Sequence, residues 1–487
     1  MVLGTAVLLG LVGVTVAQYS NETFQLTIGE PDDWPGATGL AYRYVDSIPS
    51  RAASGAAGGW VVGGWAQHAS AVARVAENGT VLWSHKLQFH EGGVPNSQTV
   101  VQCVAAMVDS GVVVAGYSYH LTPAASQAFV ARLDDTGSTV FSHVVSYGGD
   151  TSALRITACA AAADGGVMLM GEGGSVGIFS VKLDRNGVAQ GGWTTDADPH
   201  RRARDLKALP NGNFVYSGNE YVPNDDGVVS GVNASAGVGG GSGTVLGRQL
   251  QAGNHWLVTE LDPGGRPIRR GLFGDTEWGH NTDIVYVDNP PGQEGYLLSG
   301  HIQNREYETS ILVLRVATDL QTVVWSRHLR GLPRYTNDHS SQGVALTPAG
   351  LVVVTGIDEK RRSIASFLNY STGEVALAKN YGRRAEQSHM QRVVTTRNGG
   401  LLFVGKHRVE NRQATLTYLV KTGPRGDSGC AAREDNVVPA PVFDDAGLTG
   451  ADLDSVPSQK IVFMMEPYLE LQMTPWAQEQ HIEECNV

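Results

Sequence analysis

The stretch DGGVMLMG at residues 164–171 carries the pattern that decides the fold: a turn, four apolar residues and a closing glycine. Six variants of it lie along the chain, namely GGWVVGG at 58–64, DSGVVVAG at 109–116, NGNFVYSG at 211–218, EGYLLSG at 294–300, AGLVVVTG at 349–356 and NGGLLFVG at 398–405. Their closing glycines are spaced 52, 55, 47, 82, 56 and 49 residues apart. A period near fifty residues indicates a repeat architecture.

Each copy is the second strand of a larger unit. In the second unit, TVVQCVAAM at 99–107 precedes the copy, FVARLDDTG at 129–137 follows it, and VFSHVVSYGG at 140–149 completes the unit. Short β-rich runs separated by Asp-Gly and Asn-Gly turns are typical of hairpins. Four strands in each of seven units predict an all-β fold, the seven-bladed β-propeller. We number the blades 1 to 7 along the chain and expect the strand tryptophans Trp83, Trp193 and Trp325 to pack between them.

The last blade lacks a convincing fourth strand in its own stretch of sequence. After ATLTYLV at 414–420 the chain continues as PRGDSGC, which has no strand pattern. At the other end of the chain, TFQLTIGEPDDW at 23–34 parallels RRGLFGDTEW at 269–278. We therefore expect the N-terminal strand to complete blade 7 and close the ring, which leaves few free edges.

The repeat unit, an apolar strand with D-G-G, a second apolar strand, L-D-x-x-G and a strand with Trp, resembles the secreted bacterial-type β-propeller repeats (SBBP-like). The resemblance covers about residues 18–430. It implies the propeller architecture and a role as a binding or surface module. It assigns no site residues.

The composition and the N-terminus indicate the compartment. Residues 1–17 are an apolar run ending in small residues, which predicts a signal peptide, with a signal anchor as the alternative. No later segment is apolar enough to span a membrane, so we expect a secreted protein or one at the cell surface. The formal net charge of −12 argues against nucleic acid as a partner.

Four Asn-X-Ser/Thr sequons predict N-glycosylation at Asn21, Asn78, Asn233 and Asn369. Asn78 and Asn369 fall in turns between third and fourth strands, and Asn21 lies at the matching start of the closing strand. Three sequons therefore map to one face of the ring. The opposite face, with the loops between blades, is the face that we expect to meet partners.

A histidine precedes the first strand in four successive blades: His200, His280, His339 and His389. Carboxylates lie nearby in sequence: Asp205, Asp283, Asp338 and Glu386. Because inner strands converge on the axis, these side chains could meet at one channel mouth and bind zinc, copper or iron. The alternative is that the repeat simply duplicates loop residues. No nucleophile motif is present, so no catalytic residue is predicted.

The four cysteines, Cys103, Cys159, Cys430 and Cys485, are too few for a disulfide scaffold. Cys103 and Cys159 lie on the first strands of blades 2 and 3 with opposite parity. They either form a disulfide across the blade interface or remain buried thiols. Cys430 and Cys485 bracket the C-terminal segment and could pin it to the ring.

Two segments depart from the repeat. Residues 220–254 are a glycine- and serine-rich insertion between the second and third strands of blade 4. Residues 431–487 hold eleven acidic and two basic residues, a net charge of −9, together with an apolar stretch. This acidic C-terminal arm either wraps back onto the propeller or docks on a neighbouring subunit. The residues expected to make its contacts are Ile461, Phe463, Tyr468, Leu471 and Trp476, and TPWAQEQHIEEC at 474–485 predicts a short capped helix.

These observations favour a secreted, glycosylated β-propeller that acts as a non-catalytic binding or assembly module of an extracellular or cell-surface structure. Its partner, a protein or a neighbouring subunit, would contact the C-terminal arm and the glycan-free face. No cofactor is predicted beyond the transition metal considered above. The alternative is a metal-dependent enzyme or a lectin with its site at the channel mouth.

Overall fold

The computed structural model describes residues 23–29, 41–48, 58–66, 69–91, 94–95, 97–120, 126–147, 154–173, 176–195, 201–222, 253–273, 278–288, 292–303, 309–329, 343–357, 363–381, 387–408 and 415–428, with short strands between 443 and 484. The predicted signal peptide, the sequons Asn21 and Asn233, and His200, His339, Cys430 and Cys485 lie outside these residues. Within them every regular element is a β-strand.

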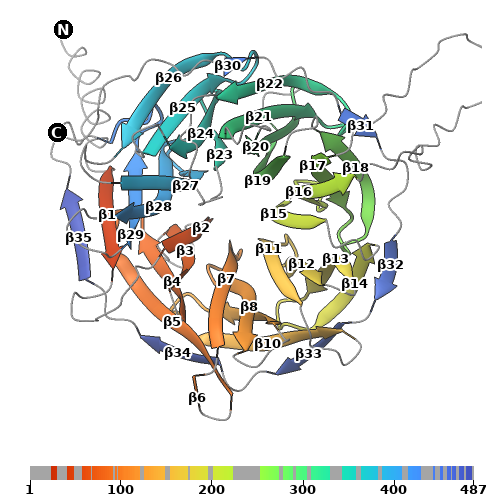
Figure 1. Ribbon diagram of the computed structural model, residues 1–487. Coiled ribbons are helices and arrows are strands. Elements are labelled where there is room, and N and C mark those ends of the chain that lie inside the picture. Colours follow the sequence, from red (N-terminus) through yellow and green to blue (C-terminus); the bar gives the residue numbers. More distant parts are fainter. Residues whose placement is uncertain are drawn as a thin grey trace, which may run out of the picture.

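Seven antiparallel sheets are arranged in a ring around a central channel, as Figure 1 shows. From the inner to the outer strand, blade 1 is β2 (Ala41–Ile48), β3 (Gly59–Ala66), β4 (Ala69–Ala76) and β5 (Val81–Glu91), with β6 (Val94–Pro95) paired to β5. Blade 2 is β7 (Ser97–Ala106), β8 (Val112–His120), β9 (Ser126–Leu133) and β10 (Thr139–Tyr147), and blade 3 is β11 (Arg155–Ala161), β12 (Val167–Gly173), β13 (Gly177–Leu183) and β14 (Ala189–Thr195). Blade 4 is β15 (Arg202–Ala208), β16 (Phe214–Val222), β17 (Gly253–Leu261) and β18 (Pro267–Phe273), and blade 5 is β19 (Trp278–Val287), β20 (Gly295–Gln303), β21 (Thr309–Ala317) and β22 (Val323–Leu329). Blade 6 is β23 (Val344–Leu346), β24 (Leu351–Ile357), β25 (Ser363–Asn369) and β26 (Val375–Tyr381), and blade 7 begins with β27 (Gln387–Thr395), β28 (Leu401–Arg408) and β29 (Thr415–Thr422).

The N-terminal strand closes the ring, as predicted. Strand β1 (Phe24–Gly29) is the fourth strand of blade 7, and it pairs antiparallel with β29, with Leu26 opposite Leu419. The first and last strands of the propeller therefore belong to one sheet. The ring is held shut by backbone hydrogen bonds as well as by side-chain packing.

The closing glycine of the repeat has a structural reason. In six blades the inner strand carries a β-bulge, and the residue before the bulge pairs with that glycine: Tyr42 with Gly64, Val101 with Gly116, Ile156 with Gly171, Ala203 with Gly218, Asn281 with Gly300 and Met390 with Gly405. A Cβ added at Gly218 would overlap the carbonyl oxygen of Arg202, and one at Gly405 would overlap that of His389. Glycine is therefore required where the bulged strand approaches most closely.

The hydrophobic core lies between neighbouring blades. One buried cluster joins Ala115 of blade 2 to Leu169 of blade 3, and another joins Leu402 of blade 7 to Val62 of blade 1. Because the second cluster crosses the point where the ring closes, burial of apolar surface and strand pairing act there together.

Neighbouring blades are also joined by hydrogen bonds from one blade to the third-to-fourth turn of the next. Trp83 Nε1 and Arg74 Nη1 of blade 1 both donate to the carbonyl oxygen of Asp135 in the turn of blade 2, at 3.0 and 2.6 Å. In that turn, Asp134 accepts backbone N–H groups and Gly137 adopts φ +86°. The prediction that the strand tryptophans pack between blades is confirmed.

The other two tryptophans make the same kind of contact. Trp325 Nε1 of blade 5 donates to the carbonyl oxygen of Tyr370 in blade 6, at 2.8 Å. The ring of Trp193 in blade 3 lies 5.6 Å from the guanidinium of Arg266 in blade 4.

The acidic C-terminal arm adds a fifth strand to six of the seven blades. In chain order, β30 (Phe443–Asp444) pairs with β22, β31 (Gly450–Asp452) with β18, β32 (Ser458–Ile461) with β14, β33 (Phe463–Pro467) with β10, β34 (Leu471–Pro475) with β5, and β35 (Glu479–Glu484) with β1. These strands are the dark blue arrows around the rim in Figure 1. The segment therefore wraps around the ring of its own chain, and we call these six strands the belt.

The structure thus realises the first of the two interpretations of the arm. The backbones of Ile461, Phe463 and Leu471 pair with Gly192, Tyr147 and Phe89 of the same chain. Contact of these residues with a partner stays a prediction. Tyr468 and Trp476 lie outside the described residues.

The short helix predicted from residues 474–485 was wrong, because β34 extends to Pro475 and residues 479–484 form β35. An isolated helix of this length is marginal in water, whereas the outer edges of blades 1 and 7 offer unpaired backbone groups.

Deletion of residues 431–487 is expected to leave the propeller folded but to make it associate. The deletion exposes the outer edges of six blades, and exposed edges favour pairing between molecules. Light scattering should then show concentration-dependent oligomers, with a melting temperature lower by a few degrees because the belt is peripheral.

A truncation after Ile461 is the matched control, since it frees only β10, β5 and β1 and should associate less. Unchanged size and melting temperature in both variants would contradict this role of the belt.

No stretch within the described residues forms a helix of the length and apolar character needed to cross a bilayer.

Candidate functional site

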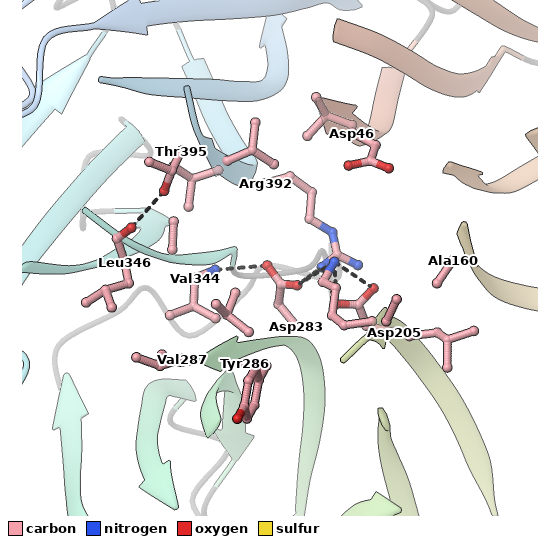
Figure 2. Close-up of a pocket in the computed structure, with 18 of the residues that line it drawn as sticks. Asp46, Ala160, Asp205, Asp283, Tyr286, Val287, Val344, Leu346, Arg392 and Thr395 are labelled. Carbon is pink, nitrogen blue, oxygen red and sulfur yellow. Dashed lines mark hydrogen bonds and ion pairs between the residues drawn. The ribbon is translucent and has the colours of Figure 1, made fainter. Parts of the chain in front are cut away.

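The candidate site is a cavity of about 1150 Å³ on the ring axis, lined by the inner strands of all seven blades. At one end of the cavity, which we call the floor, the lining residues lie at the level of the bulges, for example Gln102 on β7 and Arg204 on β15. From there the walls run to the turns between first and second strands, at Pro210 and Pro348. Figure 2 shows the charged side chains gathered at the floor of this cavity.

The cavity opens on the face that carries two of the sequons. Antiparallel blades place the first-to-second and third-to-fourth turns on the same face, and the exposed Asn78 and Asn369 lie in third-to-fourth turns. His280 and His389 precede the bulges of β19 and β27, toward the loops between blades. The cavity therefore lies on the other side of the bulges from these two histidines.

Four charged side chains from three blades form the floor. Arg392 Nη1 on β27 lies 2.6 Å from Asp283 Oδ1 on β19 and 3.7 Å from Asp205 Oδ2 on β15. Lys207 Nζ, also on β15, lies 3.1 Å from Asp205 Oδ2 and 4.0 Å from Asp283 Oδ1. The side chains of Asp283 and Arg392 are only 4% and 9% exposed, whereas Lys207, at 40%, faces the open cavity.

Arg392 reaches Asp283 past blade 6 because blade 6 has a glycine at the corresponding place. A Cβ on Gly343 would lie 2.6 Å from the backbone nitrogen of Val393 and 2.7 Å from Cα of Arg392. The missing side chain lets β27 pack directly on the start of blade 6. The guanidinium can then cross to blades 4 and 5.

The environment drives the pKa values of the two carboxyl groups apart. Burial and the neighbouring Asp205 charge raise the pKa of Asp283 to about 7, despite the opposing effect of Arg392. Burial acts on Asp205 in the same direction, but Lys207 and Arg392 outweigh it and lower the pKa of Asp205 to about 2. The pair therefore holds one proton well above the ordinary range of a carboxyl group.

The raised pKa of Asp283 predicts a pH dependence of stability. Between pH 4 and pH 7 the folded protein keeps a proton that the unfolded chain has lost, so this group stabilises the fold at the acidic end, and the contribution disappears as the pH rises through about 7. Asp205 acts in the opposite sense, and its contribution is lost only as the pH falls toward about 2. Asp283→Asn should therefore reduce the loss of unfolding free energy between pH 5 and pH 8.

Urea denaturation of both proteins at the two pH values measures this difference. Glu374→Gln, which removes an exposed turn carboxyl group, is the control. If the unfolding free energy depends on pH equally in wild type and Asp283→Asn, the prediction is wrong.

Carboxylates at the channel also join neighbouring inner strands. Asp205 Oδ2 accepts the backbone N–H of Ile284 at 3.2 Å, and Asp283 Oδ2 accepts that of Val344 at 2.9 Å. On the other side of the ring, Asp46 Oδ2 accepts the N–H of Ala106 at 2.8 Å. In each case the carboxylate spans the gap to the next blade.

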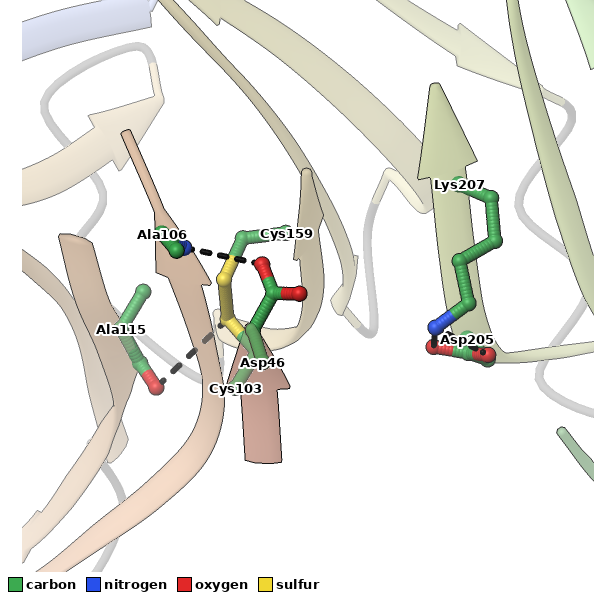
Figure 3. The surroundings of a disulfide bond; sticks show 7 residues. All are labelled: Asp46, Cys103, Ala106, Ala115, Cys159, Asp205 and Lys207. Atoms are coloured by element: carbon green, nitrogen blue, oxygen red, sulfur yellow. Dashed lines mark hydrogen bonds and ion pairs between the residues drawn. A yellow bond between two sulfur atoms is a disulfide. The ribbon is translucent and has the colours of Figure 1, made fainter. Parts of the chain in front are cut away.

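Cys103 of blade 2 and Cys159 of blade 3 form a disulfide in the wall of the cavity, with their Cα atoms 5.8 Å apart. Figure 3 shows Asp46 beside this bond, with the pair of Asp205 and Lys207 farther along the wall. The inner strands of blades 1, 2 and 3 are thus tied by an Asp–amide hydrogen bond and a covalent bond.

The structure brings together only part of the predicted site. Asp205 and Asp283 meet at the floor, while Asp338 and Glu386 lie outside the described residues. His280 pairs with His301 along the backbone, and His389 is a buried residue of β27. Within the described ranges no three His, Cys, Asp or Glu side chains are placed to hold a metal ion, and a metal site at His200, His280, His339 and His389 stays a prediction.

Sequence reasoning missed Asp46, Lys207 and Arg392. The available signal for Lys207 was its place two residues after Asp205, because alternate residues of a strand share a face. Arg392 follows the β27 bulge as Asp205 and Asp283 follow the bulges of β15 and β19, and this equivalence emerges only once the bulges are known.

No protein-family model matches the chain, and no curated protein matches it. The solved structures similar to it include one described as the mitotic checkpoint complex, at 11% identity and a TM-score of 0.42, covering 74% of this chain and 86% of that one. Another, a protein of unknown function from Dyadobacter fermentans, has 11% identity and a TM-score of 0.38, with 66% and 93% covered. A third, the polysaccharide lyase Uly1, has 10% identity and a TM-score of 0.41, with 75% and 88% covered. What identifies the chain is therefore its own architecture, a belted seven-bladed β-propeller closed by its N-terminal strand.

Proposed function

We propose that the protein is a non-catalytic binding module of an extracellular or cell-surface structure, and that its ligand enters the channel cavity. The cavity is the observation that carries this proposal. Its volume of about 1150 Å³ is slightly larger than that of most ligand pockets, which span roughly 300–1,000 Å³. Its walls combine apolar side chains with a few charged groups, as ligand sites do.

The charged groups at the floor support a binding role over a catalytic one. Asp205, Asp283, Lys207 and Arg392 are engaged with one another and with backbone amides of the next blade. Side chains held by such ion pairs and hydrogen bonds connect the blades of the ring and present a fixed surface to a ligand.

Three features support the proposed extracellular or cell-surface compartment. The apolar run at 1–17 predicts a signal peptide, and the Cys103–Cys159 disulfide fits an oxidising compartment. Asn78 and Asn369 are exposed in turns, where glycosylation needs them. The belt occupies the outer strand edges of six blades. We therefore propose that a protein partner contacts the faces of the ring, one of which is the face opposite the sequons.

A channel-blocking variant tests the proposal. Ala208 lines the cavity and is exposed in it, so Ala208→Trp should fill the cavity and abolish binding of any peptide or saccharide that an array detects with the wild type. Val188→Trp, at an exposed turn position, is the control and should bind normally. Binding that survives Ala208→Trp would place the ligand elsewhere and overturn the proposal.

A second candidate is an enzyme or lectin that uses the channel. The observation that favours an enzyme is the pair Asp205 and Asp283, whose pKa values diverge, as those of an acid and a base do. Mass spectrometry of array compounds after incubation separates the two functions, since turnover demonstrates an enzyme. Elemental analysis of protein purified without chelator tests the metal-dependent version at the four histidines.

A further inference from the structure

In six blades the β-bulge places one extra residue on the inner strand, and that residue is polar in each of them. The residues skipped by the pairing are Arg43, Gln102, Thr157, Arg204, Thr282 and Gln391. Three of them, on the adjacent blades 2, 3 and 4, line the floor of the cavity: Gln102, Thr157 and Arg204. Bulges are a common means of aiming a side chain at a functional site.

Two of these three groups have hydrogen-bonding capacity that the described residues do not use. Thr157 Oγ1 is buried without a hydrogen-bond partner among them. Arg204 is exposed in the cavity lining and makes no ion pair with the described part of the chain. Buried polar atoms are normally satisfied, so an unused hydroxyl and an unpaired guanidinium in the lining of one cavity point to an anionic group supplied from outside.

The remaining charges at the floor do not compete for Arg204. Asp205 and Asp283 are engaged by Lys207 and Arg392, and neither carboxyl group pairs with Arg204. Asp46 is on blade 1, across the ring from blade 4, and it holds the amide of Ala106. Arg204 is therefore the cation of the floor that is left to bind an anion.

Between the floor and the turns, apolar side chains share the wall with polar ones such as Asp46, Asp288 and Thr395. Val45, Val285, Leu346 and Val394 line the cavity and are partly exposed within it. Along β15 the wall runs from Arg204 to Pro210, which at about 3.3 Å per residue is about 20 Å deep. An extended peptide of five or six residues fits this depth.

We propose that the cavity binds the free C-terminal end of an extended peptide of a partner protein, with the terminal carboxylate on Arg204 and Thr157 and apolar side chains against the wall. This inference rests on the proposed function, because it names the ligand of the same cavity. A saccharide is the less favoured ligand, since its hydroxyl-rich surface would leave the partly exposed valine and leucine side chains without apolar partners.

The test compares hexapeptides of mixed apolar sequence presented with a free C-terminus and as C-terminal amides, on one array with hexagalacturonate and cellohexaose. Wild-type protein is expected to bind the best free-acid peptides at least about tenfold more tightly than their amides, because a charged hydrogen bond is lost in the amide. Arg204→Gln should abolish this preference. Arg202→Gln, on the same strand with its guanidinium 3.2 Å from Glu172, should retain it.

The outcomes separate this inference from the proposed function. Equal binding of acids and amides, or binding of the saccharides alone, overturns the peptide-terminus assignment. If that binding is lost in Ala208→Trp, the channel remains the ligand site. Acid preference that persists in Arg204→Gln removes Arg204 from the site. No difference between wild type and Ala208→Trp for any compound overturns both.

Discussion

At pH 8, where Asp283 is ionised, replacing Arg392 with methionine is expected to lower the free energy of unfolding by about 3–5 kcal/mol, the usual cost of breaking a buried ion pair by removing one partner. Asp283 is 4% exposed, and the Arg392 guanidinium lies 2.6 Å from its Oδ1. Methionine keeps much of the side-chain volume but leaves this carboxyl group without its closest cation. The inner strands of blades 5 and 7 then lose their direct connection across blade 6.

A double-mutant cycle checks the cause. Combining Arg392→Met with Asp283→Asn removes the unpaired carboxyl group and should recover a large part of the lost free energy in urea denaturation. Arg397→Met, at an exposed position after the same strand, is the control and should have little effect. A loss below about 1 kcal/mol in Arg392→Met would show that the cluster does not hold the ring.

Removal of the Cys103–Cys159 disulfide is expected to cost about 4 kcal/mol. The bond closes a loop with a sequence separation of 56 residues, and loop-closure entropy in the unfolded chain gives a stabilisation of that size. For the roughly 320 residues that the structure describes, this corresponds to a fall of about 6 °C in melting temperature. The loop includes the second to fourth strands of blade 2, so the bond also restrains that blade against blade 3.

The double variant Cys103→Ala/Cys159→Ala, compared with wild type without reductant, measures this contribution. Each single variant should match the double variant, because either replacement breaks the bond. Wild type treated with reductant should approach the variants, while the variants themselves should change less. Equal stability of wild type and double variant without reductant would contradict the expected effect.

The sequence by itself determined the fold because the repeat is a local signal. Each copy, such as DGGVMLMG at 164–171, specifies a turn, a buried strand and a glycine at fixed spacing, and seven copies specify the ring. The N-terminal strand at 23–34 could be assigned to blade 7 from its likeness to 269–278, and β1 occupies that place. The same repetition predicted that Trp83 and Trp325 pack between neighbouring blades.

The arm shows where local signals fail. Proline and glutamate near residues 475–484 match the start of a helix, yet the segment forms strands on the outer edges of blades 1 and 7. Strand pairing depends on which backbone groups are unpaired in the finished ring, and that information lies hundreds of residues away. The belt is therefore a property of the assembled propeller.

The candidate site was decided by tertiary structure for the same reason. Asp205, Asp283 and Arg392 lie on three different blades and meet only because bulges reset the register of each inner strand and Gly343 lets β27 approach. The sequence supplied the carboxylates and the converging strands. Which charges pair, which carboxyl group keeps its proton, and which guanidinium is left for a ligand depend on distances and burial across the ring, which only the folded chain defines.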